Sequence, residues 1–99
     1  MTRLRYHEAA EEELLHEIGY LEFQAQGLGR RFFAEIRRAE DRIAQFPQSA
    51  QEIRPGIRKC ILRAFQYALI YAIERDGVLI LAVAHHRRRP GYWAGRITG

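Results

Sequence analysis

The sequence predicts an α+β domain in which an antiparallel two-helix hairpin packs on a small, curved, mainly antiparallel sheet. Three observations support this fold class. Two segments carry apolar residues at helical spacing, a β-hairpin signal follows them, and the longest apolar run, residues 78–84, has the length of a buried strand. A length of 99 residues suits a single domain over residues 1–99. Because the apolar run is too short to cross a bilayer, we expect no membrane partner.

The chain begins with a predicted edge strand and a first helix. Residues 3–6 alternate basic and apolar side chains, which is typical of a short strand. Apolar residues then recur at steps of three and four from Ala10 to Ala25, so this segment is predicted to be an amphipathic helix. The opposite side of this helix carries glutamates, and we expect that acidic face to point to solvent.

A second helix and a loop follow. Residues 27–29, Gly-Leu-Gly, interrupt the first helical pattern, and a second apolar stripe covers residues 32–46. Pro47 ends it, because a residue that precedes proline disfavours helical dihedral angles. The two helices are therefore predicted to form a hairpin. Residues 47–56 are polar and rich in turn formers, so we expect a loop there.

Three further strands are predicted after the loop, giving the order β-α-α-β-β-β. Residues 57–64 carry β-compatible side chains, and residues 67–73 alternate at strand periodicity. Asp76-Gly77 is a strong hairpin signal, and it places the last strand over residues 78–85. Since that strand is apolar on both faces, we expect it to lie centrally in the sheet. The C-terminal residues are expected to be irregular or briefly helical.

Basic residues are concentrated after the first helix. The sequence has sixteen Lys and Arg against twelve Asp and Glu, a formal net charge of +4. Residues 1–26 alone carry −4, whereas residues 27–99 carry +8. A basic surface of this kind attracts phosphate backbones or an acidic protein partner.

The candidate binding residues lie on the predicted sheet and just after it. The basic run at residues 87–89 could bind carboxylates or phosphates, or could be only a solvated cluster. Tyr92 and Trp93 could stack on a base or a protein surface, or could hold the C-terminus on the sheet. The full set of binding candidates is Arg58, Lys59, Arg63, Arg87, Arg88, Arg89, Tyr92 and Trp93.

The chain offers few groups for a metal, a cofactor or a nucleophile. Cys60 is the single cysteine, which excludes an internal disulfide and Cys-rich zinc sites. His85 and His86 could act as general bases, but adjacent residues of a strand point to opposite faces and are poorly placed to bind one metal ion. We therefore expect no metal and no cofactor.

Two runs resemble a known family. F-Q-Y-A-L-I-Y at residues 65–71 resembles the "F-P-Y-x-I-x-Y" strand of the RelE/ParE toxin superfamily, and V-A-H-H-R-R-R-P-G-Y-W at residues 83–93 resembles its "V-x-H-x-R-R-x-P-x-Y-W" signature. The resemblance implies a RelE/ParE-like fold and a bacterial, cytoplasmic toxin of a type II toxin–antitoxin (plasmid stabilization) pair. It also implies a cognate antitoxin that neutralises the toxin with an acidic or amphipathic segment and supplies the binding to operator DNA.

The resemblance leaves two branches, since RelE-like members cut mRNA on the ribosome and ParE-like members inhibit DNA gyrase. The candidates for RelE-like catalysis are Lys59, His86, Arg87 and Tyr92. Ile61 and Ala68, however, stand where the RelE pattern has a lysine and an arginine, and an alanine cannot stabilise a charged phosphorane. The C-terminal signature is also closer to ParE-like members. We therefore predict a ParE-like gyrase inhibitor, with a RelE-like endoribonuclease or a degenerate, non-toxic interaction module as alternatives.

Overall fold

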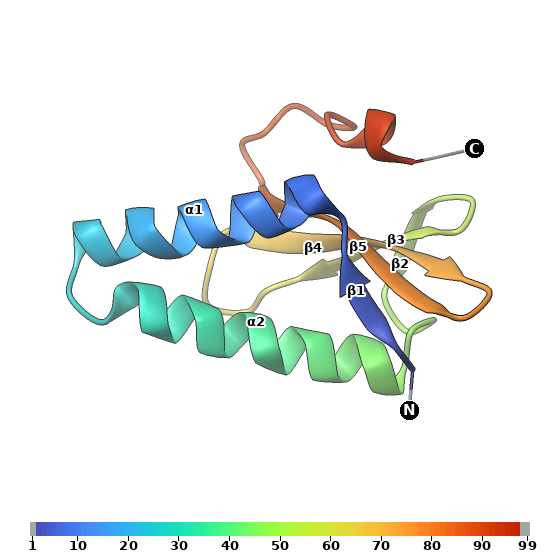
Figure 1. Ribbon diagram of the computed structural model, residues 1–99, viewed down its shortest axis with the longest axis horizontal. Coiled ribbons are helices and arrows are strands. Elements are labelled where there is room, and N and C mark those ends of the chain that lie inside the picture. The colour runs from blue at the N-terminus through green and yellow to red at the C-terminus, as the bar shows by residue number, and fades with distance from the viewer. Residues whose placement is uncertain (1, 98–99) are drawn as a thin grey trace.

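The computed structural model describes residues 2–97 and has the predicted α+β architecture, with both long helices on one side of a five-stranded sheet (Figure 1). The elements are β1 (Leu4–Tyr6), α1 (Glu8–Gln24), α2 (Leu28–Gln45), β2 (Gln51–Arg54), β3 (Ile57–Ile61), β4 (Tyr67–Glu74), β5 (Gly77–His85) and a 3₁₀ helix (Ala94–Arg96). The predicted helical hairpin is confirmed, and the chain order is β-α-α-β-β-β-β.

The strand order across the sheet is β1-β5-β4-β3-β2. Strands β2 to β5 pair antiparallel in sequence order, and β1 lies parallel to β5. The predicted edge position of the first strand and internal position of the last strand are confirmed. Residues 78–83 of β5 are all buried, because helices cover one face of this strand and the C-terminal segment covers the other.

The predicted loop over residues 47–56 is wrong in part, because residues 51–54 form β2. All four side chains of this strand are exposed, so no alternation of buried and exposed residues identifies it in the sequence. It pairs with β3 alone, and its register shifts between Glu52 and Arg54. The predicted strand over residues 57–64 is shorter than expected and ends at Ile61.

Two separate apolar clusters stabilise the two faces of the sheet. The larger one joins the helices to the sheet and includes Phe32, Ile36 and Tyr71, each at most 1% exposed. The smaller one lies on the opposite face, where Trp93 of the C-terminal segment packs with Ile70. Trp93 is only 5% exposed, so this side chain anchors the C-terminal segment on the sheet.

A β-bulge determines which residues of β5 face each cluster. Ile70 of β4 pairs with Ala82, whereas the next residue, Tyr71, pairs with Ile80, so Leu81 is an extra residue in β5. Leu81 and Ala82 therefore both belong to the smaller cluster. Beyond the bulge the alternation continues from Ala82, which places Ala84 on the face that Trp93 covers.

The two helices lie close together at Gly29, and this contact can be tested. A Cβ atom on Gly29 would lie 2.5 Å from the carbonyl oxygen of Ile18. We expect Gly29→Ala to lower the free energy of unfolding by about 1–3 kcal/mol, because the helices must separate. Urea denaturation of the purified protein measures this change.

Gly19 provides the matched control, since it lies within α1 and a Cβ atom there would meet no atom within 4 Å. Gly19→Ala should raise the free energy of unfolding by about 0.5–1 kcal/mol, because alanine favours the helix. Equal effects of the two substitutions would contradict the close helix approach.

Candidate functional site

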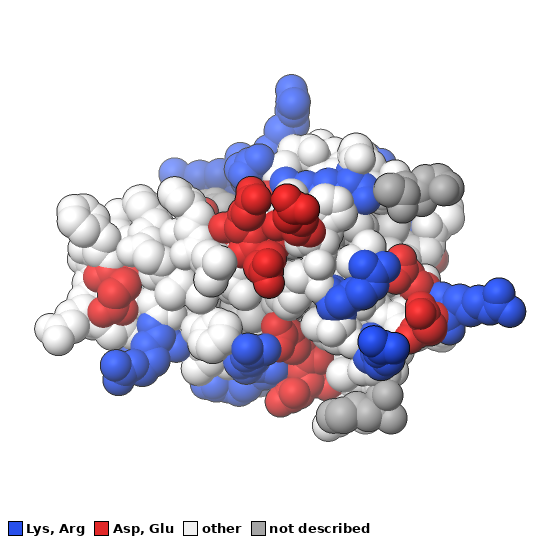
Figure 2. Space-filling view, in the orientation of Figure 1, with Lys and Arg blue, Asp and Glu red and all other residues white. Residues whose placement is uncertain are grey.

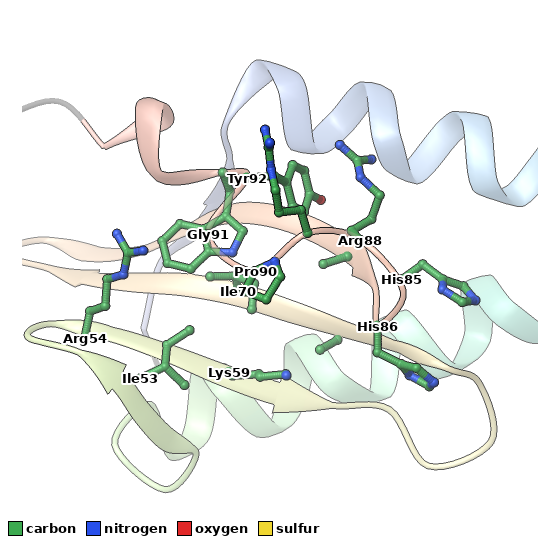
Figure 3. A pocket seen from close by; sticks show the side chains of 14 residues that line it. Ile53, Arg54, Lys59, Ile70, His85, His86, Arg88, Pro90, Gly91 and Tyr92 are labelled. Carbon is green, nitrogen blue, oxygen red and sulfur yellow. The ribbon is translucent and has the colours of Figure 1, made fainter.

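A cavity of about 350 Å³ lies on the sheet face opposite the helices (Figure 3). Its floor is formed by small apolar side chains of β4 and β5, namely Ala68, Ile70 and Ala84. These residues alternate along their strands with residues of the helix-facing cluster, such as Leu69 and Val83. The segment that follows β5, residues 86–93, closes one side of the cavity.

The walls of the cavity are positively charged. Arg54 and Lys59 come from β2 and β3, and Arg88 comes from the segment after β5 (Figure 3). Arg89 of the same segment also lines the cavity. No Asp or Glu occurs among the fourteen residues that line the cavity. This surface is therefore suited to an anionic group.

The C-terminal segment that builds this wall is held by one carboxylate of α1. The Glu13 oxygens accept hydrogen bonds from the Tyr92 hydroxyl (2.9 Å) and from both terminal nitrogens of Arg96 (3.0 and 2.8 Å). Figure 2 shows acidic side chains gathered over the N-terminal half of α1, beside basic side chains of the C-terminal segment. The Arg88 guanidinium lies farther from Glu13, at 4.0 Å.

Glu13 and Arg96 also provide hydrogen-bond partners for the exposed edge of β5. Strand β1 ends at Tyr6, so the backbone groups of β5 beyond Ile80 have no neighbouring strand on that side. The Val83 N–H donates to Glu13 (3.0 Å), and Arg96 donates to the Leu81 carbonyl (2.9 Å). Glu13 and Arg96 thus satisfy backbone groups that a longer β1 would otherwise pair.

The prediction that the acidic face of α1 points to solvent is wrong for Glu13, whose side chain is 15% exposed. Burial alone would raise the pKa of this carboxyl, but hydrogen bonds from Arg96, the Val83 N–H and Tyr92 together hold the pKa below its ordinary value. Glu22 of the same helix has a structural role as well, since it accepts hydrogen bonds from the N–H groups of Gly27 and Gly29.

Tyr92 lines the cavity, but its hydroxyl is not free because it donates a hydrogen bond to Glu13. Burial, together with the nearby Glu13 carboxylate, raises the pKa of Tyr92 to about 12. The Arg88 Cζ atom lies 3.7 Å from the centre of the Tyr92 ring, and the Arg96 Cζ atom lies at 5.1 Å. The ring is therefore covered by guanidinium groups, which interact favourably with its π face.

The structure brings most of the predicted binding residues together at the cavity. Its lining includes Lys59, Arg88, Arg89, Tyr92 and Trp93. His86, a candidate for RelE-like catalysis, also lines it and is exposed.

Three predicted residues lie elsewhere. The Arg58 guanidinium donates to the carbonyls of Gln48 (2.9 Å) and Ala50 (2.7 Å), so it holds the segment before β2. Arg63 follows the end of β3 and borders a different hollow. Arg87 is exposed and does not line the cavity.

The two histidines both line the cavity, and the centres of their rings lie 5.2 Å apart. The His85 ring packs edge-on against Tyr67, with the ring centres 4.9 Å apart, and its Nδ1 accepts a hydrogen bond from the Arg87 N–H. His85 thus shapes the turn after β5. Within residues 2–97, no group of three or more His, Cys, Asp or Glu side chains is placed to hold a metal ion.

Sequence reasoning missed Arg54 and Glu13. Arg54 lies in the stretch that was expected to be a loop, and it reaches the cavity only because β2 pairs with β3. Glu13 is one of six glutamates in the first 26 residues, and no spacing distinguishes it from the others. Its partners, Tyr92 and Arg96, lie about eighty residues away.

Comparison with known proteins identifies the class. A family model described as the ParE toxin of the type II toxin-antitoxin system parDE matches residues 4–90. This match spans most of the chain, from β1 through the helical hairpin to the end of β5, so the fold is that of a RelE/ParE-like toxin. The chain belongs to the ParE toxin family of type II toxin–antitoxin systems.

A solved structure supports the same fold. The chain is similar to a structure described as the chromosomal ParDE TA system from P. aeruginosa, with a TM-score of 0.72 and 17% sequence identity. The alignment covers 86% of this chain and 96% of the other. No curated protein sequence matches the chain. None of the helices within residues 2–97 is long and apolar enough to span a membrane.

The Glu13–Arg96 pair predicts a specific loss of stability. We expect Glu13→Gln to lower the free energy of unfolding at pH 7 by about 2–3 kcal/mol, because it removes the charged acceptor of a mostly buried guanidinium. Thermal denaturation should show a correspondingly lower midpoint. Glu12→Gln, at an exposed position of the same helix, should change stability by less than about 0.5 kcal/mol. A Glu13→Gln effect as small as that of the control would contradict the account.

The lowered pKa of Glu13 also predicts a pH dependence. Because the pKa is lower in the folded than in the unfolded protein, the stabilisation is complete above about pH 5 and is lost as the pH falls through the folded pKa. The stability difference between the wild type and Glu13→Gln should therefore shrink from pH 7 to about pH 3. Urea denaturation at several pH values measures it, and a difference that stays constant would refute the assignment.

Proposed function

We propose that this chain is the toxin of a type II toxin–antitoxin pair, that it inhibits DNA gyrase, and that a cognate antitoxin neutralises it. The observation that carries the proposal is the match of the ParE toxin family over residues 4–90. As a gyrase inhibitor it acts in the bacterial cytoplasm, and operator DNA is reached through the antitoxin.

The form of the site supports a macromolecular partner. The cavity volume of about 350 Å³ is at the low end of the ~300–1,000 Å³ typical of ligand pockets. Cations line the cavity and continue outside it, where Arg87 is exposed on the same turn. A surface of this kind suits a protein or nucleic-acid partner better than a large enclosed cofactor.

A RelE-like ribonuclease has weaker support from the side chains present. Ala68 is part of the apolar floor, and Ile61, its partner on β3, is 63% exposed and carries no charge. The hydroxyl of Tyr92 donates to Glu13, and a phenol with a pKa of about 12 is a poor proton donor near neutral pH. Ile61 and Ala68 therefore provide no cation at the two positions where the RelE pattern has a lysine and an arginine to stabilise the phosphorane.

Two assays on the same preparation test the proposal. Purified toxin at micromolar concentration should inhibit supercoiling of a plasmid by DNA gyrase, and it should leave mRNA intact on translating ribosomes. Unaffected supercoiling would overturn gyrase inhibition, and ribosome-dependent mRNA cleavage would favour the RelE-like alternative.

Neutralisation is tested in cells. Induction of the chain should arrest growth, and co-expression of the adjacent antitoxin gene should restore it. Normal growth on induction, with folded protein present, would instead indicate a non-toxic interaction module.

A further inference from the structure

We propose that the chain itself binds the phosphate backbone of duplex DNA, through cations that run from the basic cavity to a second hollow beside strand β3. This inference goes beyond the proposed function, in which operator DNA is reached through the antitoxin. The placement of the cations, the absence of acidic side chains among them, the covered aromatic rings and the apolar floor each support it.

The second hollow has a volume of about 330 Å³ and lies between the C-terminal half of α2 and strand β3. Arg42 and Arg63 line it together with Lys59, which also lines the basic cavity. Lys59 therefore connects the two hollows. We call their shared set of cations the cationic track, and its members are Arg42, Arg54, Lys59, Arg63, Arg88 and Arg89.

The track has almost no acidic partners of its own. Within residues 2–97, Arg88 is its one member with a carboxylate within 4.0 Å, that of Glu13. No Asp or Glu lines either hollow. Glu35 accepts a hydrogen bond from the backbone N–H of Arg63 (3.2 Å) and forms no ion pair with its guanidinium. A ligand with regularly repeated negative charges can neutralise cations in both hollows at once, as the phosphates of a nucleic acid do.

Two cations of the track are held in position before any DNA binds. An Arg42 terminal nitrogen lies 3.8 Å from the Cys60 Sγ atom. The Arg54 Cζ atom lies 4.9 Å from the centre of the Trp93 ring. A Cβ atom on Gly91 would come within 2.7 Å of an Arg54 terminal nitrogen, so glycine leaves room for this guanidinium. Cations that are already ordered lose less conformational entropy when they bind a phosphate.

The aromatic rings favour a duplex over a single strand. Single-stranded nucleic acids are bound largely by stacking of successive bases on exposed aromatic rings. Trp93 is only 5% exposed, and Arg88 covers the Tyr92 ring. His86 is exposed, but a single imidazole offers no platform for successive bases. The cavity is therefore suited to the outside of a duplex, where the phosphates lie.

The floor of the cavity favours DNA over RNA. It consists of the apolar side chains of Ala68, Ile70 and Ala84, which have no hydrogen-bonding group for a ribose 2′-hydroxyl. Their methyl groups can contact deoxyribose while the phosphates lie against the cations. Phosphate contacts carry no sequence information, so the choice of operator stays with the antitoxin.

Fluorescence anisotropy of labelled DNA tests the proposal, with the full chain and without gyrase or antitoxin. A duplex of about 20 base pairs should bind with a Kd of about 1–100 μM at physiological salt. Since each neutralised phosphate contributes about −0.9, the slope of log K against log salt concentration should be about −3 or steeper. Duplex RNA and single-stranded DNA of the same length should bind more weakly.

Variants locate the binding. Lys59→Gln combined with Arg63→Gln removes one shared cation and one cation of the second hollow. It should weaken DNA binding by about tenfold or more and make the salt slope shallower by about 2.

Arg3→Gln combined with Arg75→Gln is the matched control, because both residues are exposed and neither lines a hollow of the track. This control removes the same charge and should weaken binding by less than about twofold. The NMR spectrum of each variant checks that it is folded.

Three outcomes would overturn the inference: no binding of duplex DNA at physiological salt, an equal loss in the control variant, or tighter binding of duplex RNA or single-stranded DNA. The supercoiling assay separates this failure from that of the proposed function. Gyrase inhibition without DNA binding by the isolated chain would overturn only the DNA-backbone inference. DNA binding with unaffected supercoiling would overturn only the gyrase proposal.

Discussion

The hydrogen bonds of the Glu13 carboxylate determine how the C-terminal segment lies on the domain. Glu13 joins α1 to the edge of β5 through the Val83 N–H and to the C-terminal segment through Tyr92 and Arg96. A partly buried carboxylate is stable in this position only because three kinds of donor face it, which is why its pKa is lowered despite the burial. The contact has a structural consequence for the surface, since the segment it holds forms one wall of the basic cavity.

The requirement for this contact follows from the short first strand. β1 pairs with β5 over only three residues, so the rest of that edge of β5 needs other hydrogen-bond partners. On the opposite face of the sheet, Trp93 packs over Ile70 in the smaller apolar cluster. The C-terminal segment is thus fixed both by polar contacts at the strand edge and by apolar contacts on the face, and the cavity lies beside it.

The sequence patterns predicted the elements whose burial is periodic and missed those that depend on pairing at long range. Both helices and the strands of residues 57–61, 67–74 and 77–85 follow from the spacing of apolar side chains or from the Asp-Gly turn. β2 has four exposed side chains and therefore no such pattern. The lysine, arginines and aromatics at the cavity could be predicted from the resemblance, but Arg54 and Glu13 could not, because their roles depend on contacts between distant segments. Arg58 shows the reverse case, since its charge indicated a binding role while its guanidinium holds backbone carbonyls.

The Glu13 carboxylate holds the C-terminal segment in place, and that segment forms one wall of the cavity. The most direct measurement is native-state hydrogen exchange of the wild type and Glu13→Gln, read at single amides by NMR. Glu13→Gln should accelerate exchange at the amides of Val83 and of residues 92–97. This acceleration, relative to the wild type, should be at least about ten times larger than the acceleration at Leu69 in the centre of the sheet. Equal acceleration at all of these amides, or unchanged exchange at Val83, would contradict the claim.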